Sequence, residues 1–207
     1  MASPRLPSKI IAVGRNYADH VSELGEDRPP QRPRIFLKPP SAIIGSGAAI
    51  VLPAESAQVE HEAELAVFIG RRMRRVSADS ALAYVAGYGC ANDVTARDIQ
   101  RAEQLPTYAK SFDTFCPLGA MASADTVNPA DLLVECIVND ETRQRGRTSA
   151  MLTPVPALLA HITAAMTLEP GDVVLTGTPA GVGPLRHGDV VRVRISGLPD
   201  LVNQVTR

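Results

Sequence analysis

Short apolar runs separated by glycine, proline and charged turns follow one another along the chain. Runs of this length, bounded by turn residues, are typical of strands. In residues 190–195 (VVRVRI) apolar and charged residues alternate, which indicates a strand with one buried face. After residues 132–138, Asn139 and Asp140 predict a tight turn into the second arm of a hairpin. The strands that this pattern predicts cover residues 9–13, 34–38, 59–69, 132–138, 173–176 and 190–195.

Three segments have the composition of short helices. Residues 17–24 lie between Asn16, a favourable N-cap, and Gly25, a favourable C-terminal residue. A second helix is expected to begin after Ser77 and to run to about residue 86, and a third covers residues 156–167 with a proline in its first turn. Because helices and strands do not alternate regularly, the predicted fold class is α+β, mainly β, with a few short helices.

Composition and charge narrow the class of protein. The 207 residues are 45% hydrophobic and 21% charged, an ordinary balance for one globular domain that spans residues 1–207. The net charge of -1 provides no field that would attract nucleic acid or a membrane surface, so neither is an expected partner. No apolar run approaches the ~20 residues of a membrane span, and residues 1–10 lack the apolar stretch of a signal peptide.

The cysteines indicate a reducing environment. Cys90, Cys116 and Cys136 are an odd set with no close pair in the sequence. Reduced, partly buried thiols are therefore expected, together with a cytoplasmic location.

The strongest chemical signal is the acidic first half of residues 59–69. Glu60, Glu62 and Glu64 are spaced by two, so on a strand they would project from one face. Carboxylates at that spacing repel each other by about 2–3 kcal/mol per pair at an effective dielectric of 20. The apolar second half indicates burial on both faces, and a buried acidic face needs a cation. Carboxylate oxygens suit a hard ion such as Mg²⁺, Mn²⁺ or Ca²⁺. A solvated edge strand is the alternative.

A second acidic cluster follows in GYGCANDVTARDIQ. Asp93 emerges there from a turn-rich stretch of small residues. Arg97, Asp98 and Gln100 follow in the same segment and give an anion-binding group beside a potential metal ligand. An exposed pair between Arg97 and Asp98 is the alternative interpretation.

A histidine and a glutamate lie three residues apart in the first predicted helix. His20 and Glu23 are close enough there to hydrogen-bond, which would orient the imidazole as a base. The charged, proline-rich residues 26–33 that follow Gly25 are typical of a mobile lid. An incidental surface pair is the alternative.

Two lysines and a glycine-rich loop complete the polar set. Lys38 and Lys110 each border a hydrophobic stretch, where a half-buried ammonium group binds a carboxylate or an enolate, or else extends to solvent. The loop TGTPAGVGPL, residues 176–185, lacks the spacing of a phosphate-binding motif. Its backbone N–H groups would suit a substrate carboxylate, or the loop is a plain turn.

Together these segments resemble the fumarylacetoacetate hydrolase family, and most closely its short acylpyruvase branch with oxaloacetate decarboxylase or tautomerase activity. The resemblance extends from about residue 10 to residue 191. It rests on the segments VGRNYADHVSELG, IFLKP, HEAELAVFIG, GYGCANDVTARDIQ, AKSFDTFCPLG and GDVVLTGTPAGVGPL.

The resemblance implies a fold, a cofactor and roles. The fold would be a mixed β-sandwich roll, usually a homodimer, with a Mg²⁺ or Mn²⁺ ion. Glu60 stands where some relatives carry histidine and is left out of the ligand set. The implied metal ligands are Glu62, Glu64 and Asp93, the catalytic residues are His20, Glu23 and Lys110, and the substrate-binding residues are Lys38, Arg97, Gln100 and Thr178.

The implied activity is hydrolysis of the C–C bond of a 2,4-dioxo acid to pyruvate and an organic acid. His20, oriented by Glu23, would activate the water, and the metal and Lys110 would stabilise the enolate of pyruvate. Oxaloacetate decarboxylation or keto–enol tautomerisation needs the same enolate and is the first alternative. A non-catalytic metal-binding module is the second, but it would need neither the His20–Glu23 pair nor Lys110.

Overall fold

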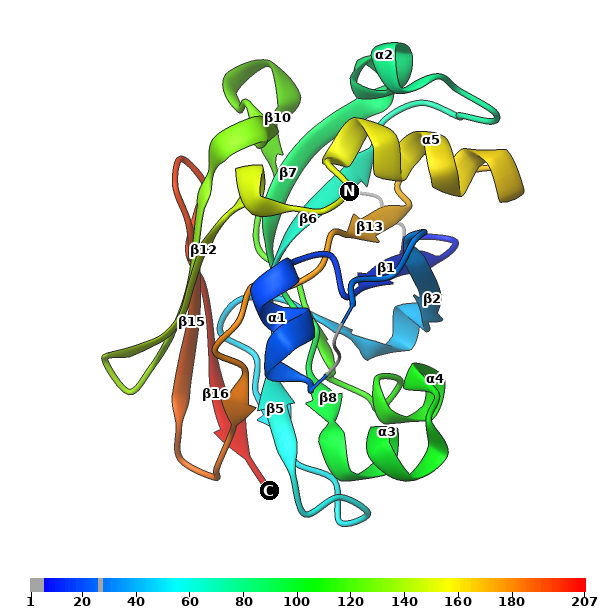
Figure 1. Ribbon diagram of the computed structural model, residues 1–207. Coiled ribbons are helices and arrows are strands. Elements are labelled where there is room, and N and C mark those ends of the chain that lie inside the picture. Colours follow the sequence, from blue (N-terminus) through cyan, green and yellow to red (C-terminus); the bar gives the residue numbers. More distant parts are fainter. Residues whose placement is uncertain (1–5, 26–27) are drawn as a thin grey trace.

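Two large sheets and a set of short helices make up the computed structural model, which describes residues 6–25 and 28–207 (Figure 1). The first sheet has six strands in the order β10-β7-β6-β13-β1-β2, and the second has five in the order β12-β11-β15-β16-β4. The strands of the first are β1 (Ile10–Gly14), β2 (Arg34–Lys38), β6 (Ala63–Ile69), β7 (Val85–Asn92), β10 (Ala122–Ser123) and β13 (Val173–Leu175). Those of the second are β4 (Ile50–Val51), β11 (Leu133–Val138), β12 (Glu141–Arg147), β15 (Val190–Ile195) and β16 (Leu201–Thr206).

Smaller sheets and helices fill the space around these two. In Figure 1 helix α5 lies beyond one end of the first sheet, and α1, α3 and α4 lie toward the other. The small sheets pair β14 (Gly183–Pro184), β5 (Val59–His61) and β8 (Thr95–Ala96), and β3 (Ile43–Ile44) with β9 (Cys116–Pro117). The α-helices are α1 (Ala18–Glu23), α2 (Ala78–Ala81), α3 (Arg97–Glu103), α4 (Pro106–Ala109) and α5 (Val155–Ala165). Short 3₁₀ turns are η1 (Pro40–Ala42), η2 (Leu82–Tyr84), η3 (Ala124–Thr126), η4 (Pro129–Asp131) and η5 (Thr148–Ala150).

The expected mixed, β-rich fold is confirmed, and several elements have the predicted bounds. Strand β2 and strand β15 match the predicted residues. The hairpin of β11 and β12 turns at Asn139 and Asp140, both with positive φ, a conformation that these two residue types tolerate. Among the described residues no helix is long and apolar enough to cross a membrane. The three cysteines are free and buried, and burial raises the pKa of each thiol to about 12.

The acidic strand predicted over residues 59–69 is interrupted at Glu62. Strand β5 ends at His61 and pairs with β8 and β14, whereas β6 begins at Ala63 and pairs with β7 and β13 in the large sheet. The chain therefore changes sheet at an acidic residue. The six residues of β6 other than Phe68 are buried, so the expectation that its apolar half is covered on both faces is confirmed.

Strand β7 was not predicted, because its sequence VAGYGCAN is poor in strand-forming residues. Its glycines are required by a neighbouring chain segment: a Cβ at Gly87 would lie 2.1 Å from the carbonyl oxygen of Ala122, and one at Gly89 would lie 3.0 Å from the ring of Phe68. The turn-rich interpretation of this stretch was therefore wrong. Close approach of two backbones explains the small residues.

Three helix predictions need correction. Asn16 does not cap α1, whose N-cap is Tyr17; the Asn16 amide bonds to Thr153 and Thr176 instead. The helix after Ser77 ends at residue 84, through α2 and η2, because β7 begins there. Helices α3 and α4 were not predicted. The third helix, α5, lies within two residues of its expected bounds.

We predict that Gly87→Ala destabilises the fold. The added Cβ would collide with the backbone of β10, and an overpacked core position costs about 3 kcal/mol at the upper end of the usual range. For a chain of this size that corresponds to a fall in Tm of roughly 6–12 °C in differential scanning calorimetry. Gly45→Ala is the control, since its Cβ would meet no heavy atom within 4 Å. Equal Tm values for the two variants would contradict the proposed collision.

Candidate metal centre and active site

Three buried carboxylates converge where β5 passes into β6 and where β7 ends. Glu62, Glu64 and Asp93 each place an oxygen within 4.8 Å of the others, and all three are buried. The Asp93 N–H donates to the carbonyl oxygen of Glu62 at 2.8 Å, which fixes the two chain segments side by side. The alternative interpretation, a solvated edge strand, is therefore wrong.

Cationic side chains pair with two of these acids, Glu62 and Asp93. Lys110 Nζ lies 2.7 Å from Glu62 Oε2 and 2.6 Å from Asp93 Oδ2, and it also donates to Thr95 Oγ1. Lys38 Nζ lies 2.7 Å from Asp93 Oδ1, as an ion pair without the alignment of a hydrogen bond.

Arg97 connects Glu60, on β5, with Glu62, the residue at which the chain changes sheet. Its Nε donates to Glu60 at 2.7 Å, and its Nη2 donates to Glu62 at 2.5 Å. Asp98, its expected partner in the surface-pair interpretation, instead accepts hydrogen bonds from Ser56 and Ala57, so that interpretation was wrong. Extension of the two lysines to solvent is likewise wrong, since Lys38 and Lys110 are 1% and 3% exposed.

The acids differ in how their charge is balanced. Burial alone would raise the pKa of Glu62, but Lys110 and Arg97 hold it well below its usual range. Burial, reinforced by Asp93 and Glu62, raises the pKa of Glu64 well above its usual range. Within the described part of the chain no ion pair reaches Glu64, and its Oε2 accepts a hydrogen bond from the Gly177 N–H at 2.7 Å. A divalent cation would supply the missing positive charge.

The donor set therefore fits a hard divalent ion. All three groups offer oxygen, and the cluster contains no thiol or imidazole, which zinc would favour. Glu60 is not part of this trio; its carboxylate accepts hydrogen bonds from Arg97 and Gln58 instead.

His20 and Glu23 meet as the helical spacing predicted. His20 Nδ1 lies 3.0 Å from Glu23 Oε2, and His20 is 4% exposed. Because a carboxylate only accepts, Nδ1 carries the proton and Nε2 is left as a basic atom. The other oxygen of Glu23 accepts a hydrogen bond from the Gly181 N–H at 2.9 Å.

The glycine-rich loop has a different use from the one expected. Two of its N–H groups, those of Gly177 and Gly181, donate to the protein's own carboxylates at Glu64 and Glu23. Gly181 has φ +98°, and a Cβ there would lie 2.1 Å from the carbonyl oxygen of Arg143. The loop thus fixes the position of Glu64 relative to the His20–Glu23 pair.

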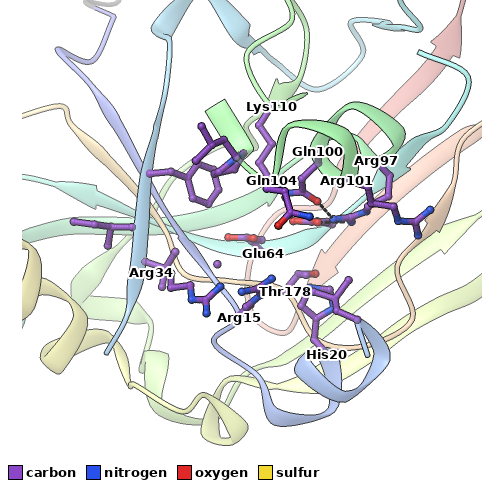
Figure 2. A pocket seen from close by; sticks show the side chains of 18 of the residues that line it. Arg15, His20, Arg34, Glu64, Arg97, Gln100, Arg101, Gln104, Lys110 and Thr178 are labelled. Carbon is purple, nitrogen blue, oxygen red and sulfur yellow. Dashed lines mark hydrogen bonds and ion pairs between the residues drawn. The ribbon is translucent and has the colours of Figure 1, made fainter. Parts of the chain in front are cut away.

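These groups surround one cavity of about 620 Å³. In Figure 2 Glu64 lies at its centre, with Lys110 on one side and His20, Arg15 and Arg34 on the other. Lys38 and Asp93 are not among the lining residues, and the two form an ion pair with each other. Of the predicted residues, those that line the cavity are His20, Glu23, Glu62, Glu64, Arg97, Gln100, Lys110 and Thr178.

Four polar lining residues were not predicted as site residues from the sequence: Arg15, Arg34, Arg101 and Gln104. Arg15 has a positive φ of 61°, which is uncommon for a residue with a side chain. Nothing in the segment VGRNYADH predicts this conformation or the position of Arg15 at the cavity. The expected lid of residues 26–33 lies partly outside the described residues, since Glu26 and Asp27 are not described.

We predict that Mn²⁺ raises the Tm of the metal-stripped protein. An ion bound only to the folded state at 100 times its Kd adds about 2.7 kcal/mol, or roughly 5–10 °C for this chain length. Asp93→Asn should lose most of that rise, because it removes a ligand charge. The Tm of both proteins is measured by differential scanning calorimetry with and without Mn²⁺. If Mn²⁺ raises the Tm of Asp93→Asn as much as that of the wild-type protein, the ion binds elsewhere.

Comparison with known proteins agrees with this geometry. The family model described as "Fumarylacetoacetate (FAA) hydrolase C-terminal" matches residues 9–206. Oxaloacetate tautomerase FAHD1, mitochondrial, of Bos taurus is 42% identical over 203 residues, which cover 96% of this chain and 90% of the relative. Oxaloacetate decarboxylase, mitochondrial, of Dictyostelium discoideum is 43% identical over 196 residues, which cover 92% of this chain and 89% of the relative.

A solved structure shows the same fold. Fumarylpyruvate hydrolase from Pseudomonas aeruginosa, in complex with Mn²⁺ and pyruvate, superposes with a TM-score of 0.91 at 29% identity. The match covers 100% of this chain and 98% of that chain. The sequence and the fold lead to the same conclusion: this chain belongs to the fumarylacetoacetate hydrolase family.

Proposed function

We propose that this chain is a metal-dependent hydrolase that cleaves the C–C bond of 2,4-dioxo acids, of the acylpyruvate or fumarylpyruvate type, to pyruvate and an organic acid. The observation that carries the proposal is the His20–Glu23 pair, whose basic Nε2 belongs to the same cavity as the carboxylates Glu62 and Glu64. A structural metal site would need no oriented base.

Glu62, Glu64 and Asp93 would hold Mg²⁺ or Mn²⁺, which supplies Lewis-acid polarisation of the 2-oxo acid when bound. His20 takes the proton of a water that attacks the distal carbonyl, and Glu23 stabilises the imidazolium that results. The bond to the acyl carbon breaks with its electron pair on the pyruvate fragment, which leaves as an enolate and becomes pyruvate when the proton on His20 is returned to its carbon. The Lys110 ammonium, fully charged beside Glu62 and Asp93, lies in position to stabilise that negative charge.

The cavity also favours a substrate with a second carboxylate. Arg15 and Arg34 both line it: Arg15 directly follows β1, and Arg34 is the residue of β2 that pairs with Gly14. Two guanidinium groups at one side of a cavity suit a carboxylate at the far end of the substrate. Gln100 and Thr178, two of the residues expected to bind substrate, also line this cavity and add polar groups to its wall. A dicarboxylic dioxo acid such as fumarylpyruvate fits these groups better than a monocarboxylic one.

Oxaloacetate decarboxylation or tautomerisation is the second candidate. The two relatives named above carry these activities in their names at 42% and 43% identity. Oxaloacetate is itself a dicarboxylic 2-oxo acid, and either reaction would use the same enolate beside Lys110. The base distinguishes the candidates, because decarboxylation needs no activated water.

His20→Ala should lower the kcat of fumarylpyruvate hydrolysis by about 10²–10⁴, the usual contribution of a positioned base. Its effect on oxaloacetate decarboxylation should be much smaller. Both rates are measured with saturating Mg²⁺, by loss of dioxo-acid absorbance and by release of CO₂. Glu23→Gln, which keeps the imidazole, serves as the milder comparison. An unchanged hydrolysis rate would remove His20 as the base, and equal losses in both reactions would favour the oxaloacetate candidate.

Arg34→Met should discriminate between substrates. Loss of a charge-assisted hydrogen bond to the distal carboxylate is expected to lower kcat/KM for fumarylpyruvate by about 10- to 100-fold. The kcat/KM for acetylpyruvate, which has no second carboxylate, should be nearly unchanged. Arg74→Met, an exposed arginine outside the cavity lining, is the matched control. A parallel loss on both substrates would show that Arg34 does not read the distal carboxylate.

A further inference from the structure

One side chain of the second sheet, on β12, reaches toward the metal centre. Gln144 is the only buried residue of β12, and it is 0% exposed. The hairpin around it presses against the glycine-rich loop, since a Cβ at Gly146 would lie 2.6 Å from Pro179. The proposed mechanism gives Gln144 no role, and it does not line the cavity.

Every hydrogen-bonding position of the Gln144 amide is used. Its Oε1 accepts from the backbone N–H of Ala63 and from His61 Nδ1, both at 2.9 Å. Its Nε2 donates to Thr178 Oγ1 at 2.7 Å and to the carbonyl oxygen of Pro179 at 2.8 Å. A backbone N–H only donates and a carbonyl only accepts, so this orientation of the amide is the one that satisfies all four partners. His61 must then carry its proton on Nδ1.

The same reasoning fixes the hydroxyl of Thr178. Because Thr178 Oγ1 accepts from Gln144, its own proton is free to point to the carbonyl oxygen of Ala63, 2.8 Å away. Gln144 therefore holds Ala63 from both sides, at the N–H directly and at the carbonyl through Thr178. Ala63 is the residue between the two glutamates of the metal centre, at the point where the chain changes sheet.

We infer that Gln144 is a positioning residue for the metal centre. By fixing the peptide groups of Ala63, it sets the separation of the Glu62 and Glu64 carboxylates before an ion binds. No ladder partner from β13 extends this far, because the pairing of β6 with β13 ends at Ala66. The Gln144–Thr178 pair replaces those missing backbone contacts. The inference rests on the metal site of the proposed function but not on the identity of the substrate.

Titration of the metal-stripped protein with Mn²⁺, followed by isothermal calorimetry, tests the inference. Gln144→Leu keeps the bulk of the side chain and removes all four hydrogen bonds. Loss of an outer partner of a metal ligand usually weakens binding about 10- to 100-fold, and that is the expected rise in Kd. Thr178→Val should also weaken Mn²⁺ binding, because it removes the hydroxyl that bonds to Gln144 and to the carbonyl oxygen of Ala63. It leaves the hairpin of β11 and β12 unaltered. The loss in the double variant should be smaller than the product of the two single losses.

Matched variants separate positioning from general stability. Thr178→Ser, which keeps the hydroxyl, should retain the wild-type Kd, and so should Thr142→Ala, an exposed residue on the same strand. A lower Tm with an unchanged Mn²⁺ Kd in both Gln144→Leu and Thr178→Val would overturn the inference and leave the proposed function intact. Absence of Mn²⁺ binding in the wild-type protein would overturn both.

Discussion

The structure depends on the balance of charge in one buried cluster. Four carboxyl groups meet three cationic groups there: Glu60, Glu62, Glu64 and Asp93 face Lys38, Arg97 and Lys110. Opposite unit charges about 4 Å apart attract by roughly 4 kcal/mol at an effective dielectric of 20, and like charges repel as strongly. One carboxyl is left without a counter-charge, and the raised pKa of Glu64 locates that deficit. A divalent cation supplies positive charge at the place where the deficit lies.

The fold brings this cluster together from distant parts of the chain. The acids come from the junction of β5 and β6 and from the end of β7, and the lysines come from β2 and from the end of α4. The glycine-rich loop after β13 then links the cluster to the His20–Glu23 pair, since Gly177 and Gly181 donate to Glu64 and Glu23. A change in this loop is therefore expected to alter both the metal centre and the base. The second sheet takes part through β12.

The sequence predicted what local pattern encodes. Strands β2 and β15, the turn at Asn139 and the contact of His20 with Glu23 follow from alternation, turn residues and helical spacing. Strand β7 was missed because its glycines are required by close contact with residues that are distant in the sequence. A local sequence pattern contains no information on such contacts. Gln144 was missed for the same reason, since an isolated glutamine in a polar arm gives no signal of burial.

The central claim is that Glu62, Glu64 and Asp93 bind one divalent ion directly. A crystal grown with Mn²⁺ and measured near the manganese absorption edge tests it. We predict that the strongest anomalous difference peak lies within about 2.0–2.3 Å of a carboxylate oxygen of each of the three residues, the range for small divalent ions with oxygen ligands. A strongest peak elsewhere, or Lys110 still bonded to both Glu62 and Asp93 with no peak between the three acids, would contradict the claim.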